Sequence, residues 1–158
     1  MEFEDLLKAL EEASGITGLE PDDMHMVELD MNGTSLTIFG DPRSRTVVLL
    51  SEIGDLPLES RGSFYELALK ANWFVQNGGD AVLAITPETN ALALNRAYPM
   101  DELDGEKFVG LVFRFASAIS FWQRLAADWR GTEEEGAEEA ATAAEDSTPI
   151  GDEQVIRG

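Results

Sequence analysis

Residues 64–122 constrain the fold more than any other part of this chain, because apolar segments with two different periods follow one another there with clear breaks. A helical pattern comes first, then a polar break, then two short strand-like segments joined by a turn, and then a long helical stripe. In chain order these segments lie at 64–74, 77–79, 81–86, 87–90, 91–97 and 104–129. Because no helix separates the two strand-like segments, they predict an antiparallel hairpin.

The preceding residues predict a further helix and a three-stranded meander. Phe3, Leu6, Leu7 and Leu10 form one apolar stripe, and Gly15 is a natural helix stop. Asn32-Gly33 is a strong hairpin signal between two alternating segments. The predicted elements are a helix at 2–13 and strands at 24–31, 34–39 and 45–51. The complete order, α-β-β-β-α-β-β-α, predicts an α+β protomer with a twisted antiparallel sheet flanked by helices.

Helix caps are predicted from polar residues that stand just before the two later helices. Ser63 is expected to cap the helix that follows it, and Asp101 or Asp104 is expected to cap the last helix. The helix after Ser63 is expected to bury one face, formed by Phe64, Leu67, Ala68, Ala71 and Phe74.

Composition restricts the classes of partner. The chain has 158 residues and a formal charge of −20, so it lacks the clustered cations that nucleic acids or anionic membrane surfaces require. It has no cysteine, its first residues are acidic, and no apolar run approaches the length of a membrane span. We therefore expect a cytoplasmic protein with one folded domain over residues 1–130.

Residues 131–158 form a separate, acidic segment. They contain nine Asp and Glu residues and one basic residue, Arg157, so we expect a disordered tail. Two roles remain open for it. It either acts only through its charge, or it contains a short docking motif at Ile150 and Val155-Ile156-Arg157.

No catalytic or cofactor motif is visible in the sequence. Gly78-Gly79 lacks the other glycines of a dinucleotide fingerprint, and one histidine, His25, cannot form a multi-histidine metal site. The acids at 22–23 and 101–104 precede predicted elements, where capping explains them. We therefore expect a protein that is not an enzyme and binds no cofactor or metal.

The first predicted hairpin is apolar on both phases, which points to a protein-binding surface. A sheet covered on one face only should be polar on the other. Flexible methionines are common on adaptable binding surfaces. Either helices cover both faces, or one face forms an exposed groove for a segment of another chain. The apolar residues are Met24, Met26, Val27, Leu29, Met31, Leu36, Ile38 and Phe39.

An ordered set of motifs resembles the class I type III secretion chaperones, the Tir-chaperone family. The set comprises the L-x-x-x-A-N-W-F helix end at 67–74, the Gly78-Gly79 break and the Pro87-Glu88-Thr89 turn. It also includes Leu103-Asp104 and the long helix with Phe115 and Trp122. The resemblance covers about residues 3–129, and it gives no role to the acidic tail.

This resemblance implies a homodimer that binds the N-terminal segment of a secreted effector and keeps it secretion-competent without ATP. The secretion ATPase is a further implied partner. The implied dimer contacts are Leu67, Ala71, Phe74, Leu83, Ile85, Leu92 and Leu94. The implied effector-binding residues are Leu7, Met24, Met26, Val27, Leu29, Ile38 and Phe39.

A second class of protein has a similar predicted order. The bacterial sensory-transduction regulators are dimeric protein-binding modules that are not known to escort effectors. The sequence separates the two classes only by the motifs given above.

Overall fold

The computed structural model describes residues 1–31, 33–54, 56, 59–75 and 81–129, with residues 74 and 75 described in their backbone only. It contains three α-helices, one short 3₁₀ helix and a five-stranded sheet, in the predicted α-β-β-β-α-β-β-α order. The elements are α1 (Phe3–Ser14), β1 (Met26–Met31), β2 (Thr34–Asp41), β3 (Thr46–Gly54), α2 (Arg61–Val75), β4 (Val82–Ile85), β5 (Leu92–Pro99), η1 (Met100–Glu102) and α3 (Gly105–Asp128).

The sheet is antiparallel throughout and has the strand order β1-β2-β3-β5-β4. The hairpin of β4 and β5 therefore joins the meander through β5, which pairs with β3. The register places Leu29 opposite Leu36 and Leu83 opposite Leu94, so the apolar residues of neighbouring strands share one face.

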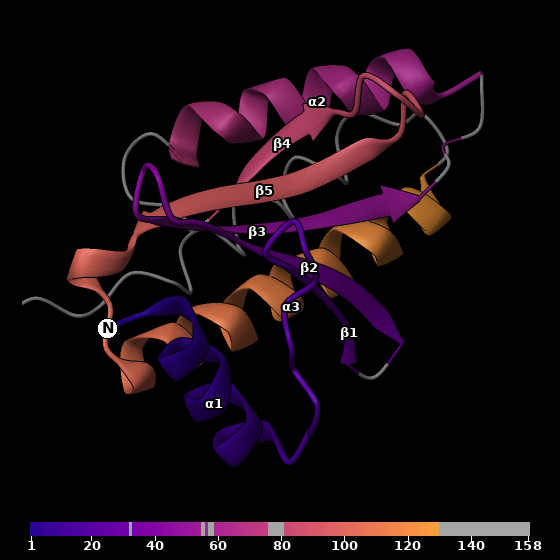
Figure 1. Cartoon of the computed structure of the whole chain (residues 1–158). Helices are drawn as coiled ribbons and strands as arrows, with labels where there is room; N and C mark the ends of the chain where they lie inside the picture. The colour runs from indigo at the N-terminus through magenta and orange to yellow at the C-terminus, as the bar shows by residue number, and fades with distance from the viewer. Residues whose placement is uncertain (32, 55, 57–58, 76–80, 130–158) are drawn as a thin grey trace, which may run out of the picture.

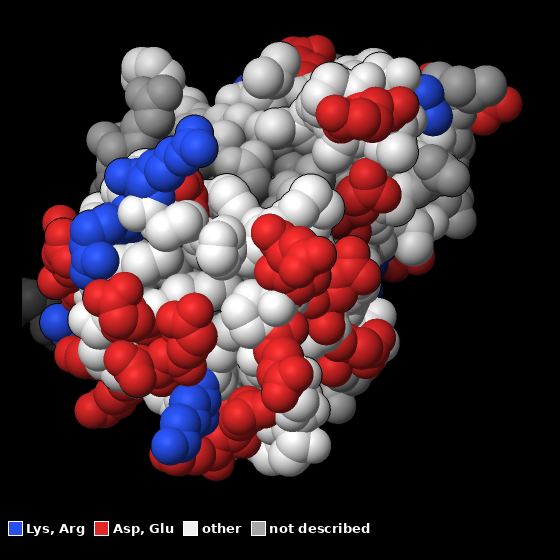
Figure 2. Space-filling view, in the orientation of Figure 1, with Lys and Arg blue, Asp and Glu red and all other residues white. Residues whose placement is uncertain are grey.

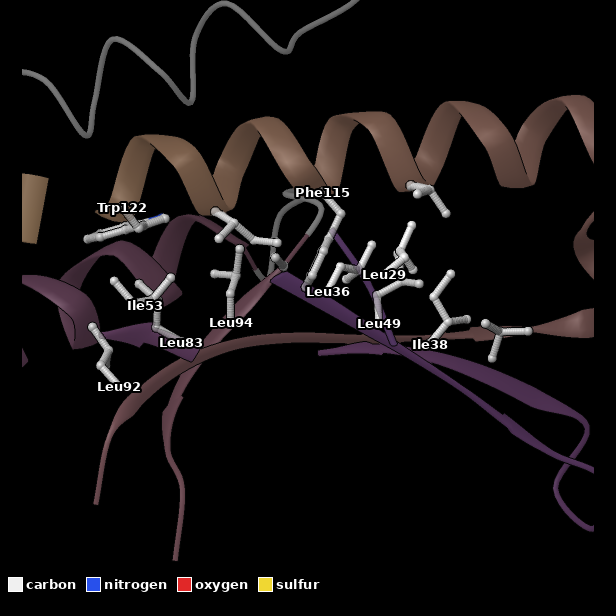
Figure 3. Packing of buried hydrophobic residues seen from close by; sticks show 14 of the residues in the cluster. Leu29, Leu36, Ile38, Leu49, Ile53, Leu83, Leu92, Leu94, Phe115 and Trp122 are labelled. Atoms are coloured by element: carbon white, nitrogen blue, oxygen red, sulfur yellow. The ribbon is translucent and has the colours of Figure 1, made fainter. Parts of the chain in front are cut away.

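Helices α1 and α3 cover that face of the sheet, and α2 lies beside β4 at the sheet edge (Figure 1). Figure 3 shows the side chains of Phe115 and Trp122 pointing from α3 toward Leu36, Leu49 and other strand residues. Gly40 lies on this face against the ring of Phe3, where a Cβ atom would lie 2.5 Å from a ring carbon. The absence of a side chain at Gly40 is thus what lets α1 approach β2.

An aromatic cluster joins α2 to the end of α3. The ring of Phe64 meets the rings of Trp122 and Trp129 edge-on, with centroids 6.0 and 5.2 Å apart. The indole nitrogen of Trp129 also donates to the hydroxyl of Ser63 at 3.1 Å. Because both tryptophans are buried, these contacts fix the position of α2 relative to α3.

Two helix ends confirm the sequence predictions. Gly15 follows α1 in the left-handed conformation, with a φ of 74°, and its N–H donates to the carbonyl of Glu11. Asp104 caps α3 by accepting a hydrogen bond from the N–H of Lys107 at 2.8 Å. Asp101 has a different role, because its carboxylate binds the guanidinium of Arg45.

Three local predictions were wrong. Helix α2 begins at Arg61, so Ser63 lies inside its first turn and donates to the carbonyl of Ser60 instead of capping the helix. Strand β1 begins at Met26, because His25 has a positive φ of 59° and lies in a turn closed by Asp22. Strand β3 continues to Gly54, three residues beyond the predicted end.

Several predictions fall outside the described residues. These are the Asn32 half of the first hairpin turn, the break at 77–79 and the acidic tail at 131–158. Among the helices that the structure describes, none is long and apolar enough to cross a membrane.

Candidate partner-binding surfaces

The face of the sheet that points away from α3 carries a row of apolar side chains. The register places Met26 opposite Phe39, Phe39 opposite Val48, and Val48 opposite Ala97, so these residues form one row across four strands. Leu50 lies on the same face in the next row and is 37% exposed. We call Met26, Phe39, Val48, Leu50 and Ala97 the outer band.

The outer band is separate from the hydrophobic core. Met26, Phe39 and Val48 are half-buried, but none of them belongs to the buried cluster or to the apolar residues that pack against it. Strand side chains alternate between the two faces, so the neighbours Val27, Ile38 and Val47 point into the core instead. The outer band is therefore apolar surface that the described part of the chain leaves accessible.

Acidic residues lie beside the outer band on the same face. Glu28 is opposite Thr37, which is opposite Leu50, and Asp30 and Glu52 lie one row further along the strands. Asp30 accepts a hydrogen bond from the N–H of Gly33, and Glu52 accepts one from the hydroxyl of Thr89. Both donors are uncharged, so neither hydrogen bond supplies a positive charge beside the carboxylate. On the side that Figure 2 draws, uncharged surface lies between groups of acidic side chains.

The turn between β2 and β3 has its own acidic and basic residues. Hydrogen bonds from the hydroxyl of Ser44 and from the N–H of Arg43 lower the pKa of Asp41. Arg45 binds Asp101 and Glu2, at 2.9 and 3.5 Å, so its charge is compensated locally.

The structure places the effector-binding candidates in two different environments. Leu7, Val27, Leu29 and Ile38 are buried in the core of the protomer, where a partner cannot contact them without unfolding the sheet. Met24 is 64% exposed in the turn before β1, and Met26 and Phe39 belong to the outer band. The apolar pattern did not reveal Val48 and Leu50, because the alternate positions of β3, which point into the core, are equally apolar.

A second exposed apolar surface lies on α2 and β4. Leu69 and Trp73 are one helical turn apart on α2, and each is 70% exposed. Ile85 on the neighbouring strand β4 is 47% exposed. We call Leu69, Trp73 and Ile85 the α2 edge. Beside these residues, the charges of Lys70 and Glu66 compensate each other in an ion pair of 2.9 Å.

Asn72 explains part of the A-N-W-F motif. Its carboxamide donates to the carbonyl of Leu83 at 2.8 Å and accepts from the N–H of Leu83 at 2.9 Å. The side chain thereby takes the place of a neighbouring strand at one residue of β4, which leaves that residue unable to pair with another chain. This role was missed in the sequence, although a polar residue near the end of an apolar helix was a visible signal.

The dimer candidates are also divided by the structure. Leu67, Leu83, Leu92 and Leu94 are buried in the core of the protomer, and Ala71 is half-buried against it. Ile85 is exposed, and the side chain of Phe74 lies outside the described residues. Leu69 and Trp73 were missed, because the dimer candidates were taken from the apolar face of α2 that packs inward, and the helix has a second apolar face.

A shallow groove with mixed charge lies between the end of β5 and the first half of α3. Tyr98, Leu103 and Leu111 contribute apolar surface, and Lys107 pairs with Asp104 at 3.4 Å. Within the part of the chain that the structure describes, no three acidic or histidine side chains come together as a possible metal site.

Solved structures with the same fold include chains from two protein complexes. A chain of the HopA1–SchA chaperone–effector complex is 13% identical, has a TM-score of 0.66, and aligns over 77% of this chain and 93% of its own length. A chain of the ExsC–ExsE complex is 19% identical, has a TM-score of 0.63, and aligns over 80% of this chain and 97% of its own length.

YbjN from E. coli shares the fold more distantly. It is 15% identical, with a TM-score of 0.50, and aligns over 78% of this chain and 90% of its own length. A comparison with curated proteins finds no match.

The family comparison is more specific than these likenesses of fold. The model of the Tir chaperone protein (CesT) family matches residues 5–130, which include every described helix and strand except the first residues of α1. This match confirms the resemblance that the motifs indicated. The chain belongs to the Tir chaperone protein (CesT) family.

Proposed function

We propose that this protein is a type III secretion chaperone that binds the N-terminal segment of a secreted effector and keeps it secretion-competent without ATP. Membership of the family supports the chaperone role, and the related folds include chains solved as chaperone–effector complexes. The observation that carries the proposal is the outer band, an apolar surface on an acidic protein that its own described helices leave accessible.

The effector segment contacts the outer band and Met24 in this proposal. Of the residues predicted from the sequence, Met24, Met26 and Phe39 have accessible surface, and Val48 and Leu50 extend it. Leu7, Val27, Leu29 and Ile38 support the same strands from beneath, so they position the surface without touching the client.

The α2 edge forms the homodimer contact in this proposal. Exposed side chains as large as Leu69 and Trp73 are costly in water, and a second copy of α2 would cover them. A two-fold axis brings the same patch of both protomers together, so the compensated Glu66–Lys70 pair adds no net repulsion there. The buried candidates Leu67, Leu83, Leu92 and Leu94 then act indirectly, by fixing α2 and β4.

Capture of an effector tests the proposed function. The full-length chain is expressed with a candidate effector from the same bacterium, and the purified complex is treated with protease. We expect the N-terminal part of the effector to be protected, with no change on adding ATP and magnesium. The proposal fails if the effector is captured only as a globular domain, or only when ATP is present.

A paired substitution locates the client surface. Phe39→Asp with Leu50→Asp places charge in the outer band and should lower client affinity at least about tenfold. Phe113→Asp with Ser117→Asp is the matched control, because it adds the same two charges at exposed positions of α3, on the other side of the sheet. Unchanged capture by the Asp pair would place the client elsewhere.

A dimeric protein-binding module like the bacterial sensory-transduction regulators, which does not escort an effector, remains the second candidate. The observation that favours it is the fold shared with YbjN, which extends over 90% of that chain. Capture of regulatory proteins in place of a secreted effector would support this function.

The acidic tail and the cellular context complete the proposal. We propose that the protein acts in the cytoplasm, that the secretion ATPase is its later partner, and that residues 131–158 form a solvated tail. Removing residues 131–158 should leave melting temperature and dimerisation unchanged, because the tail offers little apolar surface to bury. A second truncation, after Pro149, removes Ile150 and Val155-Ile156 but keeps most of the acidic residues, so it tests the apolar end of the tail separately from its charge.

A further inference from the structure

We propose that the outer band selects client segments in which Lys or Arg lies two to four positions from apolar residues. This inference rests on the proposed function, because it gives the chemistry of the client at the surface assigned there. It comes from the charges beside the outer band and from the spacing of the strand rows.

Acidic side chains lie on the same face as the outer band, toward one end of the strands. Val48, Leu50 and Glu52 lie on the same face of β3 in successive rows, and Glu28 and Asp30 follow the same order on β1. Residues two apart on a strand are separated by about 6.6 Å, and an extended client has the same repeat. A client residue above Val48 is therefore two to four residues away, in either chain direction, from one above Leu50 or Glu52.

The acids beside the outer band have no basic partner among the residues that the structure describes. No cation there forms an ion pair with Glu28, Asp30 or Glu52. The ion pairs of the described residues involve other acids, at α2, at the start of α3 and around Arg45. A client that brings its own Lys or Arg would supply the missing countercharge.

The same charges exclude two other occupants. A second copy of this chain, placed on the outer band with a two-fold axis near Leu50, would bring Glu28 and Glu52 close to their own counterparts. The tail at 131–158, with nine acids and one arginine, would be repelled in the same way. The occupant is therefore a different chain, and a basic one.

Short synthetic peptides test the inference with the full-length protein. Three fluorescein-labelled peptides of about 12 residues alternate Val with Ser in their first half. In their second half, alternate positions hold Lys in the first peptide, Gln in the second and Glu in the third. We expect the Lys peptide to bind about tenfold more tightly than the Gln peptide at low salt, and the Glu peptide to bind most weakly. Added salt should reduce the difference.

A charge reversal and its matched control distinguish local from overall charge. Glu28→Lys with Glu52→Lys should invert the order of the three peptides. Glu12→Lys with Asp128→Lys makes the same change in net charge on α1 and α3, and should keep the original order. Circular dichroism checks that both proteins are folded.

Three results would overturn the inference. These are equal binding of the Lys and Gln peptides, an inverted order in the Glu12/Asp128 control, and no binding of any peptide. If the chain captures an effector but ignores the charge of the peptides, this inference fails and the proposed function stands. If the Lys preference is present but no effector is captured, the proposed function fails and the assigned surface stands.

Discussion

The α2 edge and the outer band are both accessible apolar surfaces, but their charges differ. The α2 edge holds the most exposed large hydrophobic side chains of the described residues, Leu69 and Trp73, beside the compensated pair of Glu66 and Lys70. The outer band is less exposed, and acids that form no ion pair among the described residues lie beside it. Surface area alone would rank the α2 edge first for any partner, whereas charge assigns the two surfaces to different partners.

The difference follows from what symmetry does to charge. At a two-fold interface every charge near the axis meets its own copy, so a surface that pairs with itself must be neutral or internally compensated. The α2 edge meets that condition, and the acidic end of the outer band does not. A chain with a formal charge of −20 can thus dimerise through one surface and keep the other free for a basic client.

The largest expected effect tests whether the outer band is a surface at all. Ile38 and Phe39 are neighbours on β2, but Ile38 is fully buried and Phe39 is half-exposed on the opposite face. Ile38→Asp should lower the free energy of unfolding by more than about 4 kcal/mol, because it buries an unpaired carboxylate. Phe39→Asp should lower it far less.

Thermal unfolding followed by circular dichroism measures both variants. For the same reason, Val27→Asp with Ile38→Asp should unfold the protein, so that pair cannot serve as a test of client binding. Equal losses of stability for Ile38→Asp and Phe39→Asp would show that another element covers the outer band.

The next effect concerns the α2 edge. Leu69→Asp with Trp73→Asp should split the proposed dimer, because two carboxylates per protomer would be buried at the contact. We expect the wild type to sediment as a dimer, and the variant as a monomer, at tens of micromolar, which is roughly a hundredfold or greater change in dissociation constant.

Leu50→Asp is the matched control for this experiment, because it introduces the same charge into the outer band. If the α2 substitutions leave the dimer intact and Leu50→Asp dissociates it, the outer band is the dimer contact and the α2 edge is the client surface.

The third effect tests whether Asn72 keeps the edge strand β4 from pairing with a strand of another chain. Asn72→Ala removes both hydrogen bonds to the backbone of Leu83, and should cost about 1–3 kcal/mol of stability. Faster hydrogen exchange at the amide of Leu83 should accompany this loss. Thr37→Ala on β2 is the comparison variant, because the side chain of Thr37 forms no hydrogen bond among the described residues. Unchanged exchange at Leu83 would refute the role of Asn72.

The order of elements was predictable from the sequence, since each segment has a clear period and clear stops. Gly15 and Asp104 ended and began their helices as predicted, through a left-handed turn and a cap. The family was also predictable, because the A-N-W-F helix end and the turn after it occur in a fixed order.

The surfaces were less predictable, for a physical reason. Strand β3 is apolar on both phases, so alternation alone could not show that Val47 points inward and Val48 outward, whereas Glu28 and Asp30 mark the outer phase of β1. Helix α2 presents Leu67 and Ala71 on one side, and Leu69 and Trp73 on another. Only the positions of α3 and β4, set by contacts between distant segments, decide which side is buried.

The smallest expected effect concerns the link between Arg45 and Asp101, which lies away from both surfaces and serves as a reference. Hydrogen bonds and the charge of Arg45 lower the pKa of the Asp101 carboxyl group. A carboxyl group with a lower pKa in the folded state stabilises the protein above its unfolded pKa of about 3.9. That stabilisation is lost as the pH falls through the folded value.

Asp101→Asn should therefore lower the melting temperature at neutral pH and have no effect at low pH. Because Asp101 is exposed, we expect the difference at neutral pH to stay within about 3 °C. Glu12→Gln on α1 is the control, and melting curves between neutral pH and about pH 3 measure both variants. Client affinity and dimerisation should not change with Asp101→Asn, since neither surface contains this pair. A loss of either one would mean that the outer band or the α2 edge depends on how the β2–β3 turn is held against η1.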